Sequence, residues 1–317
     1  FLFILIFFIF FDYLRINKDI INPKYHIPHK YLVKDKSFIE EYLKEDELID
    51  FLSSDLDKFR VLDLTGNNAS RLAAFNIETI MGYHPAKLSQ YDNILKIITE
   101  KGYYPLGLLQ ALNVKYIIHD KIGNIPGFSR LVSELKLNYY PNRSNHNGYI
   151  NSYIYENNSF LDRLFFIENI TLLSNEDKIL ENITSDLFDP QNNSYININD
   201  LSEEQISIIN NIEFDNKSMV EIIKWEPDKI IFKTISDSPQ ILFLSEIYYP
   251  GWTIDKKNII KLNGLFRGII IDEGENEYIM EFKPKDLYLG KIISNIVYII
   301  LLVVICFAIY RKKVKHV

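Results

Sequence analysis

Apolar residues gather in two runs at the ends of the chain, and between them short apolar and polar segments alternate. The last run, residues 291–310, reads KIISNIVYIILLVVICFAIY and carries a single charge, Lys291, at its start. Twenty residues of α-helix are about 30 Å long, which matches the hydrocarbon layer of a bilayer. The run is apolar on all faces, whereas a helix that borders a soluble core has one apolar stripe. We therefore expect a transmembrane helix over 287–310 rather than a buried soluble helix.

The tail after this run predicts an orientation. Residues 311–317, RKKVKHV, hold four basic residues and no acid. Basic residues next to a membrane helix favour the cytoplasmic side. Tyr288 and Tyr310 fall where the two membrane interfaces should lie. We expect the C-terminus to be cytoplasmic and the bulk of the chain to lie on the outer face of the cell membrane.

The first run, FLFILIFFIFF, extends from Phe1 to Phe11 without a charge. Eleven residues give about 16 Å of helix, which is too short to span a bilayer. The run has no initiator Met, basic leader or small-residue cleavage site, which argues against a signal peptide. We expect residues 1–14 to be the end of a truncated transmembrane helix, followed by a polar connector over 15–36. The full-length protein would then be multi-pass.

Helix-like and strand-like segments alternate over 37–212. SFIEEYLKEDELIDFLSSD predicts a helix in which Ser37 and Glu40 form a capping box. FRVLDLTG (59–66) predicts a short strand, and PLGLLQALNVKYIIHD (105–120) a helix that leads into a strand. This alternation predicts an α/β extracytoplasmic subdomain.

The pattern changes to β over 213–286. Four runs, DKIIFKTIS, QILFLSEIYY, NIIKLNGLFRGIIID and EYIMEFKP, are separated by turn residues such as SDSP and EGEN, which contains Gly274. Asn263-Gly264 between apolar residues is a strong hairpin signal. We expect an antiparallel β-sandwich here, so the predicted fold class of the whole chain is α+β.

Composition narrows the classes of partner. The chain is 47% hydrophobic, and its 35 basic and 42 acidic residues give a net charge of −7. Removing the four basic residues of the tail leaves −11 for residues 1–310. An acidic surface argues against nucleic acid as a partner and leaves the lipid bilayer as the expected one. The one cysteine, Cys306, lies in the predicted membrane helix, so we expect no disulfide.

GYHPAKL is the first segment with candidate chemistry. Gly82 permits a tight turn, and His84 is biased to an extended backbone because Pro85 follows it. Lys87 and Tyr91 are four residues apart and would share a helix face. His84 and Lys87 could contact a phosphate near the membrane. The structural alternative is a capped helix start that docks on a sheet.

EIYYPGWTID is the second such segment. Tyr248 and Trp252 could stack on a sugar ring. In the alternative, Pro250-Gly251 ends a strand and Trp252 folds into the core. The alternative is favoured because the apolar run ILFLSEIYY leads directly into the turn.

The other candidate residues are explained more simply without a ligand or a reaction. The HIPH segment has poor spacing for metal ligands and no acidic cluster near it, so we expect no metal site. Arg163 and Arg267 stand beside apolar or aromatic residues and are typical of structural arginines. We find no phosphate-binding loop, nucleophile elbow or zinc motif, and we expect neither a catalytic residue nor a cofactor in these residues.

Several motifs in order along the chain resemble the YfhO-type family of bacterial multi-pass membrane proteins. They are NIETIMGYHPAKLSQYDNIL, ALNVKYIIHD, YENNSFLDRLFFI, LSEIYYPGWTID and NGLFRGIIIDEGENEYIMEFKP, followed by the apolar run and the basic tail. The chain departs from the family pattern at Asp162, where proline is usual, and at DKKN after the tryptophan. The matches cover most of 59–310.

The resemblance implies a relative of membrane glycosyltransferases of the GT-C type. Such enzymes take a sugar from a polyprenyl-phosphate carrier on the outer face and would here modify a cell-envelope glycan or polymer. Their catalytic carboxylate usually lies in the first outer loop, which we expect upstream of Phe1. An alternative from another class is a non-catalytic, membrane-anchored carbohydrate-binding or scaffold domain in envelope assembly.

Overall fold

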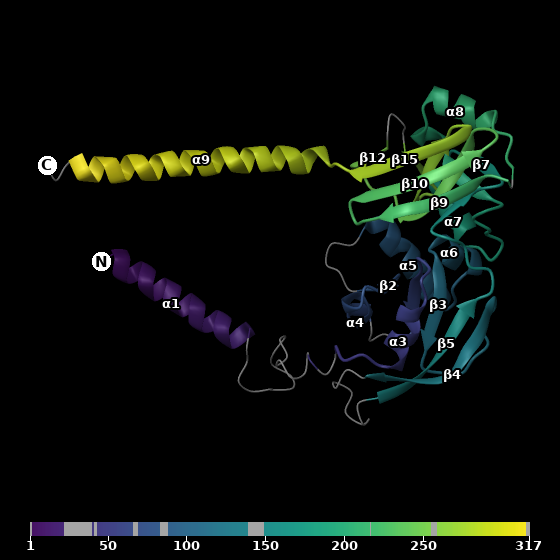
Figure 1. Cartoon of the computed structure of the whole chain (residues 1–317), viewed down its shortest axis with the longest axis horizontal. Helices are drawn as coiled ribbons and strands as arrows, with labels where there is room; N and C mark the ends of the chain where they lie inside the picture. The colour runs from purple at the N-terminus through teal and green to yellow at the C-terminus, as the bar shows by residue number, and fades with distance from the viewer. Residues whose placement is uncertain are drawn as a thin grey trace. The chain divides into compact units, whose positions relative to one another are not determined.

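A computed structural model of the chain has a mixed α and β fold, as expected (Figure 1). The structure describes residues 2–21, 40, 43–65, 69–82, 88–138, 149–215, 217–254 and 259–314. Two compact units divide the chain. Unit 1 comprises Phe1–Lys87 and Leu109–Asp162, and unit 2 comprises Leu88–Leu108 and Arg163–Val317.

Unit 1 is built on a five-stranded mixed sheet in the order β2-β1-β3-β5-β4. Strand β1 runs parallel to β2 and β3, whereas β5 runs antiparallel to β3 and β4. The strands are β1 (Arg60–Asp63), β2 (Glu78–Thr79), β3 (Val114–His119), β4 (Phe128–Asn138) and β5 (Tyr149–Asn157). The helices are α1 (Leu2–Ile21), α3 (Glu47–Ser54) and α4 (Ala69–Ala74), while α6 (Leu106–Ala111) crosses the boundary between the units. The predicted strand at 59–66 and the predicted helix and strand at 105–120 are confirmed.

Helix α3 covers the sheet through its apolar face. Leu48, Ile49 and Leu52 are at most 2% exposed and share a core cluster with residues of β1, β3 and β5. The helix begins after Asp46, whose carboxylate accepts the Ile49 N–H at 3.1 Å, a standard N-cap. The capping box predicted at Ser37 lies outside the described residues.

Unit 2 contains two sheets. One has six strands in the order β6-β11-β14-β13-β8-β7, and the other has four antiparallel strands in the order β12-β15-β10-β9. The strands of the first sheet are β6 (Leu164–Phe166), β7 (Ile170–Leu173), β8 (Ser194–Asn197), β11 (Gln240–Ile247), β13 (Ile259–Leu262) and β14 (Phe266–Ile271). Those of the second are β9 (Met219–Trp225), β10 (Lys229–Ser236), β12 (Trp252–Ile254) and β15 (Gly274–Phe282). The helices are α5 (Ser89–Lys101), α7 (Glu176–Ile183), a 3-10 turn η1 (Ile198–Asp200), α8 (Glu203–Asn210) and α9 (Lys285–Val314).

The two sheets of unit 2 share one apolar core. Residues of β6, β11 and β14 from the first sheet form a single buried cluster with residues of β10, β12 and β15 from the second. Buried and more exposed positions alternate along β10, as expected when one side of a strand faces the core, whereas β11 is buried at consecutive positions from Gln240 to Ser245. Three strands that precede residue 213 pair in the six-stranded sheet, where β7 and β8 run parallel.

The predicted Asn263-Gly264 hairpin is confirmed. Strands β13 and β14 pair antiparallel, and Asn263 and Gly264 adopt left-handed φ values of 51° and 65°. The Asn263 side chain is fully buried and accepts the Tyr195 N–H at 2.6 Å. The turn therefore also ties β8 to the hairpin.

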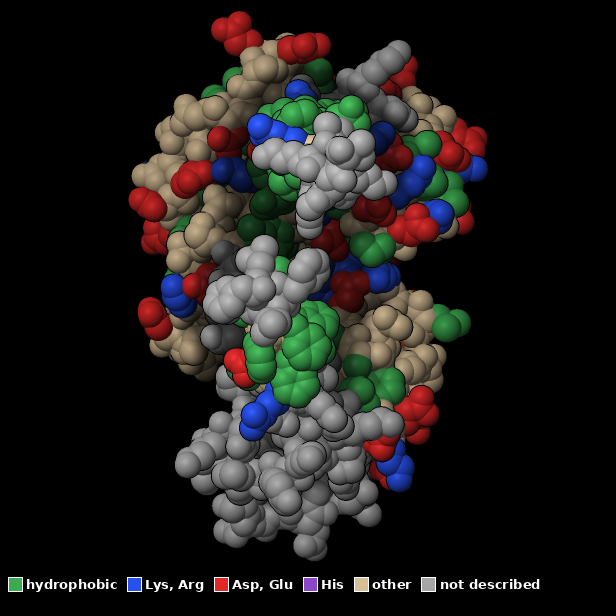
Figure 2. Space-filling view, turned by 90° about the vertical axis from the view of Figure 1, so that its left-hand side faces the viewer, with side chains coloured by type: hydrophobic (Ala, Val, Ile, Leu, Met, Phe, Trp, Pro, Cys, Tyr) green, Lys and Arg blue, Asp and Glu red, His purple; other side chains and the backbone are tan. Residues whose placement is uncertain are grey.

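Helix α9 continues from β15 after a two-residue link. Its segment Lys285–Ala308 is long and apolar enough to cross a membrane, and none of its apolar window is buried against the described protein. Figure 2 views the molecule toward the end of α9, and hydrophobic side chains surround the helix there. Within the described residues it alone meets this test of length and composition.

The N-terminal helix α1 runs past the apolar stretch to Ile21. From Arg15 to Ile21 it lies inside the region where we expected a connector, and its first charged residue is Asp12. The described side chains of α1, residues 6–16, are exposed. A truncated transmembrane helix at this end stays a prediction.

Candidate functional site

A pocket of about 310 Å³ lies in unit 2 between the start of α5 and the turn after β11. The turn carries the predicted aromatic segment, and α5 begins directly after the predicted GYHPAKL segment. Its lining residues are Leu88, Ser89, Gln90, Ile247, Tyr248, Tyr249, Pro250 and Lys261. Leu88, the last residue of the first segment, and Tyr248, Tyr249 and Pro250 of the second therefore line one pocket, which we call the tyrosine pocket.

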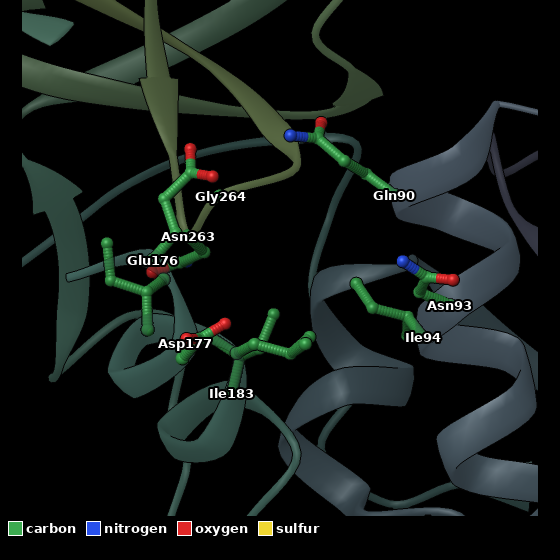
Figure 3. Close-up of a pocket in the computed structure, with 10 residues that line it drawn as sticks. Gln90, Asn93, Ile94, Glu176, Asp177, Ile183, Asn263 and Gly264 are labelled. Carbon is green, nitrogen blue, oxygen red and sulfur yellow. The ribbon is translucent and has the colours of Figure 1, made fainter.

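A second pocket, of about 160 Å³, shares Gln90 with the first, and we call it the amide pocket. In Figure 3, Gln90, Asn93 and Ile94 project from α5, and across from them lie Glu176 and Asp177 at the start of α7. Asn263 and Gly264 of the hairpin and the α7 residues Ile179, Leu180 and Ile183 complete the lining. Amides and carboxylates here surround an apolar floor.

Lys261 forms ion pairs with two carboxylates near the pockets. Its Nζ lies 2.7 Å from Glu176 Oε1 and 2.9 Å from Asp200 Oδ2. Burial would lower the pKa of Lys261, but the hydrogen bonds to the two carboxylates outweigh it, and the pKa lies above its usual value. Lys261, which lines the tyrosine pocket, is therefore a fixed cation paired with Glu176, which lines the amide pocket.

Two arginines, Arg163 and Arg267, lie close to the tryptophan rings and share the carboxylate of Glu246. The Arg267 guanidinium lies 4.1 Å from the Trp252 ring centroid, and Arg163 lies 5.4 Å from that of Trp225. Glu246 lies between the two arginines, at 3.6 Å from Arg163 and 3.9 Å from Arg267. Both arginines are at most 5% exposed, so their surroundings are those of structural groups.

The predicted site residues are only partly brought together. Tyr248 and Pro250 line the tyrosine pocket, while the Trp252 ring lies under the Arg267 guanidinium and at a tilt against the Phe282 ring. Tyr91 lies on α5, half-buried, and is not among the lining residues of either pocket.

The remaining candidates fall outside the pockets or outside the description. Gly82 is exposed, and a Cβ added there would meet nothing within 4 Å. His84, Pro85 and Lys87 lie outside the described residues, so their proposed phosphate contact stays a prediction.

Three residues of the site escaped sequence reasoning: Gln90, Glu176 and Lys261. Gln90 is the second residue after the GYHPAKL segment and lies three residues after the expected Lys87. Glu176 follows Asn175, which caps α7 by accepting the N–H groups of Asp177 and Lys178. An acid in the first turn after an Asn cap is a helix-start signal, not a ligand signal, and so it was uninformative about function.

A comparable lysine cluster lies in unit 1. Lys115 Nζ is 2.6 Å from both Asp55 Oδ2 and Asp57 Oδ2, and the Tyr116 hydroxyl donates to Asp55 at 2.7 Å. Burial would raise the pKa of Asp55, but the hydrogen bonds from Lys115, the Asp57 N–H and Tyr116 outweigh it, and the pKa lies below its usual value. A pocket of about 220 Å³ adjoins this cluster and is lined by Asp55 and Asp57.

Comparison with protein-family models, with curated proteins and with solved structures finds no match. What the site can do is therefore argued from its side chains alone. Among the residues that the structure describes, no group of three or more His, Cys, Asp and Glu side chains is placed to hold a metal ion.

The side chains around both pockets suit a neutral polyol better than an anion. Among the described residues that line the pockets or pair with their lining, three are carboxylates, Glu176, Asp177 and Asp200, and one is a cation, Lys261. Carboxylates accept hydrogen bonds from hydroxyl groups and repel phosphate. Tyr248 and Tyr249 add apolar rings with polar tips, which can cover a sugar face.

Proposed function

We propose that this chain is the C-terminal, extracytoplasmic region of a membrane glycosyltransferase that uses a polyprenyl-phosphate-linked sugar to modify a cell-envelope glycan. Its part in that reaction is to hold the glycan acceptor in the tyrosine and amide pockets. The two sheets of unit 2 form a β-sandwich that carries these pockets, and α9 anchors it in the membrane with the C-terminus in the cytoplasm.

The observation that carries this proposal is the chemistry of the two pockets in a unit that continues into an apolar helix. Tyrosine rings, amides and carboxylates line the two pockets beside α5. In the same unit, only Lys283 and Pro284 separate β15 from α9. A sugar ring needs both an apolar surface and several hydrogen-bond partners. The excess of carboxylates assigns the pockets to the neutral part of a glycan rather than to the phosphate of the carrier.

The binding part of the proposal is tested with the full chain in lipid nanodiscs. A neutral envelope oligosaccharide and a phosphate-bearing, teichoic-acid-like oligomer are titrated against it by calorimetry. We expect the neutral oligosaccharide to bind more tightly, and Tyr248→Ala and Gln90→Ala to weaken its binding. Tyr103→Ala is the matched control, because Tyr103 is 42% exposed on unit 2 but lines neither pocket. Equal affinity of all four proteins would refute the assignment of these pockets.

The alternative is a non-catalytic, membrane-anchored carbohydrate-binding or scaffold domain in envelope assembly. The ion pairs favour it, because Glu176 and Asp200 are both engaged by Lys261 and are arranged to bind rather than to transfer a proton. Sequencing the gene upstream of the Phe1 codon separates the two. Many further apolar segments, with a carboxylate-bearing loop after the first, support the transferase. An initiator codon within a few residues of Phe1 supports the binding domain.

A further inference from the structure

Both tryptophans of the chain lie at one end of the four-stranded sheet of unit 2. The register places Trp225 opposite Ile230 near the start of β10, and Trp252 opposite Phe282 at the end of β15. The same end of β15 leads into α9. The strand pairing therefore brings the two indoles to the edge from which the apolar helix departs.

The turn before Trp252 is fixed against the start of that helix. The Lys283 N–H donates to Gly251 O at 2.6 Å, and the Tyr249 ring lies 6.1 Å from the Phe282 ring. Gly251 has a φ of 108°, and an added Cβ would lie 3.0 Å from Pro284. Only glycine fits this close approach without strain. The aromatic turn is thus held beside the first residues of α9.

The aromatic side chains at this edge are partly or largely exposed. Tyr249 is 47% exposed, Leu287 and Tyr288 at the start of α9 are each 70% exposed, and both tryptophans are partly exposed. Each tryptophan stacks on a buried arginine, which fixes the indole at the edge. Tryptophan and tyrosine favour the headgroup level of a bilayer, because their rings are apolar and their N–H or O–H groups remain hydrated.

The charges around the edge are balanced. The segments 224–229 and 281–286 contribute four basic and four acidic residues: Lys224, Lys229, Lys283 and Lys285 against Glu226, Asp228, Glu281 and Asp286. A contact with lipid at this edge would depend on the aromatic rings and not on attraction to anionic headgroups.

We propose that this aromatic edge, made of Trp225, Tyr248, Tyr249, Trp252 and Tyr288, rests in the headgroup region of the bilayer and holds unit 2 against the membrane surface. The proposal rests on the part of the proposed function that places α9 in the membrane, and it is independent of carbohydrate binding. It also puts the tyrosine pocket, which shares Tyr248 and Tyr249 with the edge, at the lipid surface.

The test is tryptophan quenching by lipid in the unmodified full chain. The protein is reconstituted into vesicles of neutral phosphatidylcholine, with or without lipid brominated near the headgroup end of its acyl chains. Flotation first establishes that the chain is anchored. Because bromine quenches only on close approach, we expect brominated lipid to reduce the tryptophan emission, and anionic lipid to change that reduction little.

Each outcome decides something different. A protein that floats without loss of emission overturns the aromatic contact and leaves the proposed function standing. A protein that does not float overturns both. Tyr249→Asp should reduce the quenching, whereas Tyr103→Asp, at a similarly exposed tyrosine of the same unit, should not. Equal quenching in the two variants, with unchanged circular dichroism, would overturn the role of the turn.

Discussion

Lys115 in unit 1 and Lys261 in unit 2 each lie between two carboxylates and are almost equally buried, with side-chain exposures of 12% and 14%. In both, hydrogen bonds to the carboxylates outweigh burial and place the pKa above its usual value. Their other neighbours differ. Nζ of Lys115 lies 5.5–5.9 Å from the ring centroids of Phe59, Tyr116 and Phe160. Lys261 instead lines a pocket with Tyr248 and Tyr249.

We infer from this difference that the neighbours of an ion cluster decide whether it stabilises the fold or contacts a ligand. Around Lys115 three rings face the ammonium group, and the pocket beside the cluster is lined by Asp55 and Asp57 but not by Lys115. A cation over aromatic faces is itself stabilised. Lys261 lines a cavity together with the two tyrosines, so its ammonium group can contact a ligand bound there. We expect the first cluster to serve stability and the second to serve binding.

The largest effect should come from Lys115→Ala. The substitution leaves Asp55 without its cation in a half-buried site, and we expect it to destabilise unit 1 by about 2–3 kcal/mol. Hydrogen exchange at β3 measures this, since both tryptophans lie in unit 2 and report only on that unit. Lys96→Ala is the control. Lys96 lies in unit 2, pairs with Asp92 and is 63% exposed, so its loss should change the stability of that unit little, as measured by tryptophan fluorescence.

Tyr116→Phe should cost about 1.5 kcal/mol. It removes one hydrogen bond to the Asp55 carboxylate, and bonds to charged acceptors are stronger than neutral ones. The same exchange measurement applies. Tyr103→Phe, whose hydroxyl lies 3.4 Å from Asp186 at an exposed site of unit 2, should change the stability of that unit little, as measured by tryptophan fluorescence. Equal losses in the two variants would contradict a special role for the Tyr116 bond.

Lys261→Ala should cost only about 1 kcal/mol in stability, because Glu176 is 53% exposed and can be solvated when its partner is lost. Affinity for a neutral oligosaccharide should fall about tenfold, equivalent to about 1.4 kcal/mol. Tryptophan fluorescence during denaturation and calorimetric titration measure the two effects. Lys115→Ala should leave the affinity unchanged. The comparison between the clusters breaks down if Lys115→Ala weakens binding as much as Lys261→Ala.

The smallest effect is the acid response of unit 1. Because the folded pKa of Asp55 lies below its usual value of 3.8, the stabilisation is present above that value and is lost as pH falls through the folded pKa. We expect hydrogen-exchange protection of β3, corrected for intrinsic rates, to fall when pH is lowered from 5 to 3. Asp55→Asn should flatten this dependence, whereas Asp50→Asn, at an exposed position of α3, should not.

Local patterns carried much of the fold. The apolar run of α9, the strand at Arg60–Asp63 and the helix-to-strand segment at 105–120 were readable because period and turn residues are properties of adjacent positions. Asn263-Gly264 predicted a hairpin for the same reason. The pairing of β6 with β11 and of β8 with β13 was not readable, because it depends on contacts between segments far apart in the chain.

The sequence by itself determined the apolar helix at the C-terminal end, the β-rich region before it and the aromatic turn at Tyr248. Only the tertiary structure decided that this turn meets Gln90 of α5 and Lys261 of β13 at one pocket, and that Trp252 stacks on Arg267. The physical reason is that secondary structure follows from short-range periodicity, whereas a pocket is the space that distant elements leave between them when their apolar faces are buried.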